Sequence, residues 1–289
     1  MTVNSIDLNG KVCLITGGTG GIGRITAQAL AASGAVVVIV ARSQPKAEMV
    51  VKAIWEKTAN PQVDYLICDL SVQADVRQVA HDFRSRYGRL DVLINNAGQF
   101  FIKHEMSQDG SEMTFALNHL AYVLLTNLLL DLLVASAPAR IINVSSMAHV
   151  GSRLNLNNLQ NERGYNGWKA YGQSKLANLY FTYELARRFQ GTGVTANALH
   201  PGFVATNFGK SNGGLFIPIF KLAQLVAITP EQGAETSIYL ATSPEVAGVT
   251  GKYFIKCKAA PSSRASYDEE TARRLWEISE EMTGLKIAA

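Results

Sequence analysis

The amino-acid sequence predicts an α/β fold in which helices flank a parallel sheet, and three observations lead to this prediction. Short apolar runs alternate with stretches of helical length along most of the chain. Several runs, such as Ala35–Ala41, are apolar at nearly every position, which is typical of parallel strands buried on both faces. A glycine-rich segment lies between the first run and the first helical stretch, where doubly wound folds carry an anion-binding turn.

The apolar runs predict seven strands. The runs are Lys11–Thr16, Ala35–Ala41, Val63–Cys68, Leu90–Asn95, Arg140–Ser145, Val194–Leu199 and Lys252–Ile255. The helical stretches are 22–33, 45–58, 72–87, 109–136, 169–190 and 230–242. No Pro/Gly/Ser-rich linker divides this pattern. Residues 1–289 are therefore expected to form a single domain with a doubly wound, Rossmann-type, seven-stranded parallel sheet flanked by helices.

Two stretches exceed the minimal pattern. Residues 147–168 are polar and rich in Asn, and we interpret them as an insert. Residues 203–228 follow the sixth strand and contain the apolar run Leu215–Phe220. Because long connections often cover active sites, we expect 203–228 to be a substrate lid. The alternatives are that its apolar run packs on the domain, on a second subunit or on a membrane surface.

The end of the chain predicts a helix over 266–284. Ser266 followed by Glu269 fits a capping box, and acidic residues suit the first turn of a helix. Apolar residues then recur at helical spacing, and Gly284 is a suitable stop. This helix is expected to dock on the domain or on a second subunit.

Composition excludes several classes of protein. Of the 289 residues, 47% are hydrophobic, which excludes disorder. The net charge of +4 is small and scattered, so no nucleic-acid partner is expected. The three cysteines and five histidines are dispersed, so neither a disulfide framework nor a metal site is expected. The most apolar window, Leu117–Ala137, is interrupted by polar residues and predicts a core helix, so we expect no transmembrane segment and a cytoplasmic protein.

The glycine-rich turn after the first strand has the composition of an anion-binding loop. It runs from Thr16 to Gly23, with glycines at 17, 18, 20, 21 and 23. Glycines allow a tight turn and let backbone amides approach a pyrophosphate, to which the start of the following helix adds partial positive charge. A nucleotide cofactor is the interpretation that this context favours.

Further motifs follow in order along the chain. Asn95–Gly98 reads Asn-Asn-Ala-Gly at the end of the fourth strand, Tyr171 and Lys175 form a Tyr-x-x-x-Lys pair, and Pro201-Gly202 precedes Thr206. With the glycine spacing Gly-x-x-x-Gly-x-Gly, these motifs resemble the classical short-chain dehydrogenase/reductase family over nearly the whole chain. Phrases such as RIINVSSMAH and YGQSKLAN are most similar to its retinol-dehydrogenase-like branch. Membrane-bound members carry an N-terminal anchor, and because we expect none here, we expect this protein to resemble the soluble members.

The resemblance implies a nicotinamide cofactor. NAD-selective folds place an acid at the end of the second strand, whereas this strand ends at Arg42. A guanidinium can bind the 2′-phosphate, so NADP(H) is expected, the alternative being that Arg42 is a solvated charge. The expected cofactor contacts are Gly17, Thr19, Gly20, Gly21, Ile22, Gly23, Arg42, Asp69, Leu70, Asn95, Ala97, Gly98, Tyr171, Lys175, Pro201, Gly202, Val204 and Thr206.

Four residues match the catalytic tetrad of the family: Asn118, Ser146, Tyr171 and Lys175. Tyr171 and Lys175 share one face of a helix, where the ammonium would favour the phenolate. Tyr171 can then exchange a proton with the substrate oxygen while Ser146 polarises it, Ser145 being the adjacent alternative. By resemblance, Asn118 holds a water that connects Lys175 to solvent.

The expected function is hydride transfer between NADP(H) and a carbonyl or alcohol, with a lipophilic aldehyde, ketone or retinoid-like compound as the substrate. The apolar run in the expected lid favours this substrate class. The alternatives are an NAD-dependent alcohol or steroid dehydrogenase, a catalytically silent nucleotide-binding regulator, and a structural protein. The resemblance also implies a homodimer or homotetramer, joined through apolar helices at 117–136 and 176–189 whose faces would equally suit a core.

Overall fold

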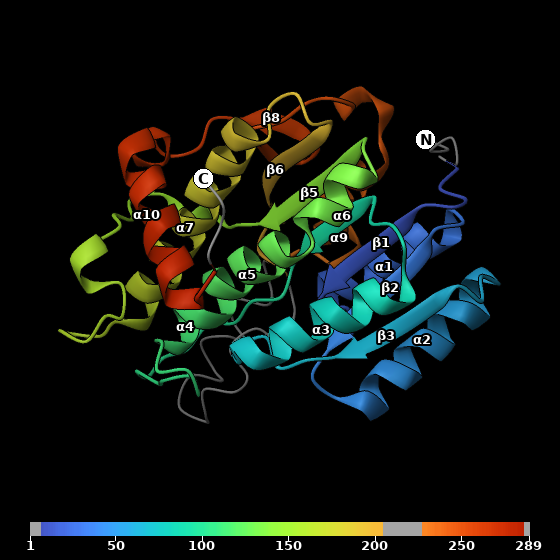
Figure 1. The fold of residues 1–289 in the computed structure, drawn as a ribbon, viewed down its shortest axis with the longest axis horizontal. Helices are drawn as coiled ribbons and strands as arrows, with labels where there is room; N and C mark the ends of the chain where they lie inside the picture. Colours follow the sequence, from blue (N-terminus) through green and yellow to red (C-terminus); the bar gives the residue numbers. More distant parts are fainter. Residues whose placement is uncertain (1–6, 205–226, 286–289) are drawn as a thin grey trace.

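The computed structural model describes residues 7–204 and 227–285, and its centre is an eight-stranded sheet (Figure 1). The strand order is β3-β2-β1-β4-β5-β6-β7-β8. The strands are β1 (Val12–Thr16), β2 (Val36–Ala41), β3 (Val63–Ile67), β4 (Val92–Asn95), β5 (Ala139–Val144), β6 (Val194–His200), β7 (Lys252–Ile255) and β8 (Lys258–Ala260). The helices are α1 (Gly21–Ala32), α2 (Gln44–Thr58), α3 (Gln73–Arg86), α4 (Met113–Phe115), α5 (Ala121–Leu128), α6 (Leu130–Ala135), α7 (Gly167–Arg188), α9 (Pro230–Thr242) and α10 (Glu269–Thr283).

Helices cover both faces of the sheet. Apolar side chains of α1, α2 and α9 pack against one face, which includes Cys13 and Ile15 of β1. Side chains of α3, α5 and α7 pack against the other face, which includes Val12 and Leu14. Successive residues of β1 are therefore buried on opposite sides, and this double burial explains why the apolar runs are continuous. The predicted doubly wound α/β fold is confirmed.

The sheet has one strand more than the seven expected. β8 turns back on β7 and pairs with it in antiparallel orientation, with Ile255 opposite Lys258. The two turn residues, Lys256 and Cys257, adopt φ angles of 48° and 61°. Such turns usually contain Asn or Gly, so Lys and Cys at these positions did not predict a hairpin.

Residues 109–136 form several helical pieces instead of the one helix expected. α4 continues into a π-helical turn, η1 (Ala116–Leu120), then into α5, and Leu129 separates α5 from α6. Asn118 lies in the middle of the π turn. Apolar periodicity runs through these changes of pitch, so the sequence pattern does not reveal them. Among the described residues, no helix is long and apolar enough to cross a membrane.

The expected insert packs on α7. It contains two short 3₁₀ turns, Met147–His149 and Leu156–Asn158. Leu159 then packs in an apolar cluster with Leu176 and Tyr180 of α7. Most of the expected lid, including its apolar run, lies outside the described residues.

The C-terminal helix begins at Glu269, so the expected capping box at Ser266 was wrong. Asp268 is the N-cap, and its carboxylate accepts a hydrogen bond from the Thr271 N–H at 3.2 Å. Ser266 belongs to the preceding 3₁₀ turn. The helix ends at Gly284, which adopts the left-handed conformation with φ 59°.

α10 packs on α7 (Figure 1). The ring of Trp276 lies 5.5 Å from that of Phe181, and the Arg188 guanidinium lies 4.4 Å from the Trp276 ring centre. The apolar side chains of α5 and α7 are buried in the core of the chain itself. Homo-oligomer formation through these two helices therefore has no support in the fold and stays a prediction.

Candidate active site

The predicted site residues gather at the carboxyl-terminal edge of the parallel strands. The glycine turn follows β1, Asn95–Gly98 closes β4, Ser146 follows β5, and Pro201 follows β6. The sheet order changes direction between β1 and β4, because β2 and β3 lie on one side of β1 and the later strands lie on the other. Doubly wound folds bind their ligands at this switch point.

The glycine turn is closely packed. Gly17 adopts φ 70°, and its N–H donates to the Val40 carbonyl of β2 at 3.0 Å. A Cβ atom at Gly23 would lie 2.4 Å from the Gly17 carbonyl oxygen and 2.7 Å from Nδ2 of Asn96. Only glycine fits at position 23, because a backbone atom cannot move aside as a side chain can.

Thr16 and Asn96, which were not among the expected contacts, join this turn to β4. The Thr16 hydroxyl oxygen accepts hydrogen bonds from the N–H groups of Asn96 and Ala97, at 2.9 and 3.0 Å. The Asn96 amide in turn donates to the Thr16 carbonyl at 2.8 Å. The available signal was a pair of asparagines at the end of an apolar strand, where side-chain amides commonly bond to backbone.

The start of α1 is suited to an anion. Gly20 is its N-cap in extended conformation, and no side chain caps the first turn. The N–H groups of a first helical turn have no partner within the helix and carry partial positive charge. A Cβ at Gly20 would meet no atom within 4 Å, so open space lies beside these amides. The residues present therefore fit a phosphate-bearing cofactor.

Arg42 is exposed at the end of β2 and forms no ion pair with the described residues. The Val40 carbonyl, two residues earlier, accepts the N–H groups of both Gly17 and Gly18, which places this strand end beside the glycine turn. No carboxylate terminates β2. A phosphate next to the turn would thus meet a free guanidinium and no acid.

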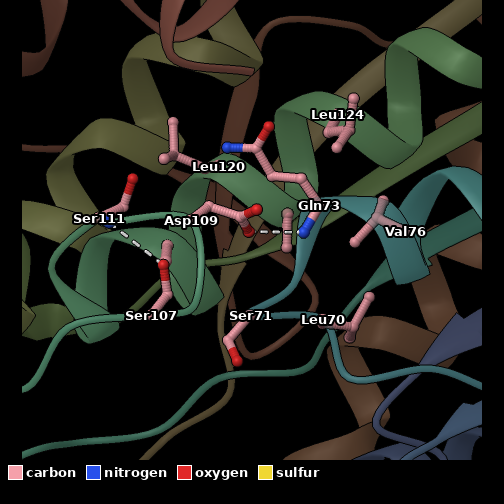
Figure 2. A pocket seen from close by; sticks show the side chains of 11 residues that line it. Leu70, Ser71, Gln73, Val76, Ser107, Asp109, Ser111, Leu120 and Leu124 are labelled. Atoms are coloured by element: carbon pink, nitrogen blue, oxygen red, sulfur yellow. Dashed lines mark hydrogen bonds between the residues drawn. The ribbon is translucent and has the colours of Figure 1, made fainter. Parts of the chain in front are cut away.

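Asp69 and Leu70 follow β3. The Asp69 carboxylate accepts hydrogen bonds from Ser71, from N–H at 2.9 Å and from the hydroxyl at 2.7 Å. Leu70 is buried and lines a small cavity between this loop and the helices α3 and α5 (Figure 2). Near it, the Gln73 N–H donates to Asp109 at 2.8 Å. The free volume of about 10 Å³ corresponds to one water molecule, so this cavity holds neither cofactor nor substrate.

The side chain of Asn95 points into the core of the protein. It is fully buried, and its amide donates to Thr126 of α5 at 3.0 Å and to Asn143 of β5 at 2.9 Å. Asn143 in turn donates to Thr182 of α7 at 2.9 Å. This side chain therefore ties β4 to β5 and α5 through its amide N–H groups, as expected of a buried amide. The expected contact between Asn95 and the cofactor stays a prediction.

Tyr171, Lys175 and Ser146 lie together. The Lys175 Nζ lies 5.6 Å from the centre of the Tyr171 ring and donates to the Val144 carbonyl at 3.0 Å. Tyr171 and Ser146 share a side-chain hydrogen bond. Ser145, the alternative to Ser146, is buried and donates its hydroxyl to the Lys175 carbonyl at 2.7 Å, so it is committed to holding β5 against α7.

Burial shifts the pKa values of Lys175 and Tyr171 in opposite directions, and in each case it favours the neutral form of the side chain. It lowers the pKa of Lys175 to about 7. It raises the pKa of Tyr171 to about 12, against the lowering effect of the hydrogen bond with Ser146. The expected effect of the Lys175 ammonium in favour of the phenolate is therefore not seen, because burial favours the neutral form of both groups. A lysine that gains and loses its proton near neutral pH can return a proton to the tyrosine after the phenol has donated its own.

Asn118 is fully buried in the π turn, behind this group. Its Oδ1 accepts from the Gln99 N–H at 2.8 Å, and its Nδ2 donates to the Gln99 carbonyl at 3.0 Å and to Ser174 at 3.1 Å. A Cβ at Gly98 would lie 3.2 Å from Lys175 Nζ and 3.3 Å from Asn118 Oδ1. Asn118 therefore holds the loop after β4 against the Lys175 side chain.

Pro201 and Gly202 follow β6 at the same edge. Gly202 adopts φ 92°, and a Cβ there would lie 2.4 Å from the Ile228 side chain. Val204 pairs with Ile228 in an isolated parallel bridge, which joins the two ends of the expected lid. Thr206 lies outside the described residues.

Comparison with known proteins agrees with this geometry. The profile of the short chain dehydrogenase family matches residues 11–213. Human retinol dehydrogenase 14 is 44% identical over 96% of this chain and 88% of its own length, and human retinol dehydrogenase 11 is 42% identical over 98% and 89%. A crystal structure of an uncharacterized protein from Mycobacterium paratuberculosis superposes with a TM-score of 0.80 at 31% identity, covering 98% of this chain and 97% of that one. Pseudomonas aeruginosa RhlG, in an active-site complex with NADP, superposes with a TM-score of 0.70 at 28% identity, covering 86% of this chain and 95% of that one.

Proposed function

Because this chain belongs to the short-chain dehydrogenase family, in its retinol-dehydrogenase-like branch, we propose that it is an NADP(H)-dependent oxidoreductase whose acid/base is Tyr171. The reaction interconverts an alcohol and a carbonyl by hydride transfer. The observation that carries the proposal is the grouping of Tyr171, Lys175 and Ser146 beside an uncapped helix start at one edge of the sheet.

The cofactor site would use backbone amides and one guanidinium. The uncapped first turn of α1 would hold the pyrophosphate, and the exposed Arg42 would hold the 2′-phosphate of NADP(H). Pro201, Gly202 and the backbone at Ala97 and Gly98 lie at the ends of the same parallel strands and would contact the nicotinamide. When bound, NADP(H) supplies or accepts the hydride.

The proton would move through Tyr171. In the reducing direction, its phenol donates a proton to the substrate oxygen, and Ser146 donates a hydrogen bond that polarises the carbonyl. Lys175 then returns a proton to Tyr171, since its pKa of about 7 allows it to gain and lose a proton near neutral pH. Asn118 keeps the loop after β4 against Lys175 and so maintains this alignment.

A lipophilic substrate, such as a retinoid or another apolar aldehyde or ketone, suits the site's surroundings. Four large apolar side chains on the segments that carry the site are well exposed: Met147, Val150, Trp168 and Phe203. The centre of the Trp168 ring lies 4.6 Å from that of Phe100 in a tilted arrangement, and Phe100 contacts the Tyr171 ring edge-on, with ring centres 5.9 Å apart. Exposed apolar surface beside a polar reacting group is the pattern expected of a site for an apolar carbonyl.

The test compares Tyr171→Phe with wild type. NADPH affinity, followed by fluorescence titration, should change by less than about twofold, while kcat/KM for retinal and simple aldehydes should fall by about 10²- to 10⁴-fold. Tyr65→Phe, which removes a surface hydroxyl bonded to Glu48, is the matched control and should leave turnover unchanged.

The outcomes separate the alternatives. Turnover retained in Tyr171→Phe would refute the assigned role. Wild-type protein that binds NADPH and reduces no carbonyl would be a nucleotide-binding regulator. Equal kcat/KM with NADH and NADPH would favour the NAD-dependent dehydrogenase.

A further inference from the structure

The peptide unit between Ser146 and Met147 lies just beyond the last main-chain pairing of β5 with β6. The final ladder bond runs from the Ser145 N–H to the Leu199 carbonyl at 2.8 Å. Ser146 itself is extended, with φ −164° and ψ 157°, and starts the 3₁₀ turn at Met147. The backbone at Ser146 therefore has no strand neighbour to hold its orientation, and other groups must supply that support.

The carbonyl of this peptide is held by His149. The His149 Nδ1 lies 2.6 Å from the Ser146 oxygen, and its Nε2 lies 3.0 Å from the backbone nitrogen of Ser263. The backbone N–H of His149 also donates to the Ser146 oxygen, at 3.2 Å, so this residue holds the carbonyl through both its main chain and its ring. A backbone N–H can only donate, so Nε2 is the acceptor and the ring proton sits on Nδ1. The neutral imidazole thus donates to the Ser146 carbonyl and is itself oriented by Ser263. The side chain is buried, and its ring contacts that of Tyr253 edge-on at 5.1 Å.

The N–H of the same peptide is held by His200. The Met147 N–H donates to the His200 Nδ1 at 3.3 Å. His200 is the last residue of β6, one position beyond Leu199. Its ring therefore connects β6 to the residues that follow β5, beyond the last main-chain hydrogen bond between these strands. The two imidazoles therefore bind the two polar groups of one peptide unit.

Resting on the proposed function, we infer that His149 and His200 form a clamp on the Ser146–Met147 peptide and are positioning residues for Ser146. The peptide plane sets ψ of Ser146 and the direction of the turn that follows. The Ser146 hydroxyl oxygen accepts the Ala148 N–H from that turn at 3.2 Å, while the same side chain hydrogen-bonds Tyr171. Rotation of the clamped peptide would move the Ser146 hydroxyl and its hydrogen bond to Tyr171 relative to the substrate oxygen.

The clamp requires neutral imidazoles, and the surroundings keep them so. Burial lowers the pKa of His200 to about 4, and the neighbouring His149 acts in the same direction. Burial also lowers the pKa of His149, against the opposing effect of its bond to Ser146. A protonated His200 would turn its Nδ1 acceptor into a donor facing another donor, so the neutral form is the one that binds the Met147 N–H.

The experiment compares leucine and asparagine at each position in the full-length protein. Asparagine places an amide where Nδ1 stood, so His149→Asn keeps a donor for the Ser146 carbonyl and His200→Asn keeps an acceptor for the Met147 N–H. His149→Leu and His200→Leu keep bulk and remove the hydrogen bond. Steady-state kcat and KM with NADPH and retinal, and the Kd of NADPH, are measured for each. His81→Leu on the exposed face of α3 is the matched control.

Each leucine variant should lower kcat by about tenfold or more, since small displacements of reacting groups cost one to two orders of magnitude. The Kd of NADPH should stay within about twofold, the asparagine variants should recover most of kcat, and His81→Leu should match wild type. Because both rings hold one peptide, the double leucine variant should lose less than the product of the single losses.

Wild-type kcat in folded leucine variants would overturn the clamp while leaving the proposed function intact. Asparagine variants that fall as far as leucine, or that lose NADPH affinity in parallel, would also overturn it, because they would indicate a general packing role. If buried His149→Leu does not fold, partly exposed His200→Leu decides the question. A wild-type protein without turnover would instead refute the proposed function.

Discussion

Replacing Gly23 with alanine should damage both the stability and the cofactor affinity of the protein. The new Cβ would lie 2.4 Å from the Gly17 carbonyl oxygen, well inside van der Waals contact, and 2.7 Å from Nδ2 of Asn96. Overpacking of a close-packed site costs about 1 to 3 kcal/mol, and a clash with backbone belongs to the upper half of that range. At about 2 °C or more per kcal/mol, the melting temperature should fall by roughly 5 °C.

The clash also displaces the turn that would hold the cofactor. Relief requires movement of Gly17, whose N–H anchors the turn to β2. We therefore expect the Kd of NADPH, from fluorescence titration, to rise at least tenfold, equivalent to about 1.4 kcal/mol. The melting curve of the same preparation gives the stability.

Gly20→Ala and Gly88→Ala separate the two effects. A Cβ at Gly20 meets nothing within 4 Å and needs no unusual φ, so stability should hold, but it enters the space beside the uncapped amides and NADPH affinity should fall by a similar factor. A Cβ at Gly88 is equally free and far from this edge, so neither quantity should change. Wild-type NADPH affinity in Gly20→Ala would refute the assignment of these amides to the phosphates, and an unchanged melting temperature in Gly23→Ala would refute the packing argument.

Two further substitutions test the charge of Arg42 and the packing of Trp276. Arg42→Asp should lower kcat/KM with NADPH by about 100-fold and leave kcat/KM with NADH unchanged or higher. The reason is that a charge-assisted hydrogen bond worth about 3 kcal/mol becomes a repulsion. An unchanged ratio of the two kcat/KM values would refute the role of Arg42. Trp276→Ala should reduce the free energy of unfolding in urea by about 3 to 5 kcal/mol, because the side chain is only 3% exposed between Phe181 and Arg188. Trp55→Ala, at a side chain that is 53% exposed, is its control, and equal losses for the two variants would contradict the buried docking of α10.

Features that depend on local sequence were predictable. The glycine turn follows from Gly17 and Gly23, because Gly17 adopts φ 70° and a Cβ at Gly23 would lie 2.4 Å from the Gly17 carbonyl oxygen. Tyr171 and Lys175 lie one helical turn apart, so their proximity needs only that a helix forms there. The strands were recognisable because side chains on both sides of β1 are buried, which leaves a continuous apolar run.

Features that depend on contacts between distant segments were not predictable. The side chain of Asn95 has the residue type of a cofactor contact, yet its position on the strand turns it toward Thr126 and Asn143. The start of α10 depends on which of several polar side chains accepts a hydrogen bond from the free N–H groups of the first turn. Asp268 does so in the structure, but the sequence pattern favoured Ser266 as the N-cap as well. The π turn around Asn118 keeps the apolar pattern of an ordinary helix.

The sequence by itself determined the fold class, the anion-binding turn and the Tyr171–Lys175 pair, because each follows from residue types at short, fixed spacing. Only the tertiary structure decided that the Ser145 hydroxyl bonds to the Lys175 carbonyl and that His149 and His200 lie around one peptide. Those contacts depend on the register between β5 and β6 and on the side of α7 that faces them. These contacts join segments that lie dozens of residues apart in the sequence, so residue types at short spacing do not reveal them.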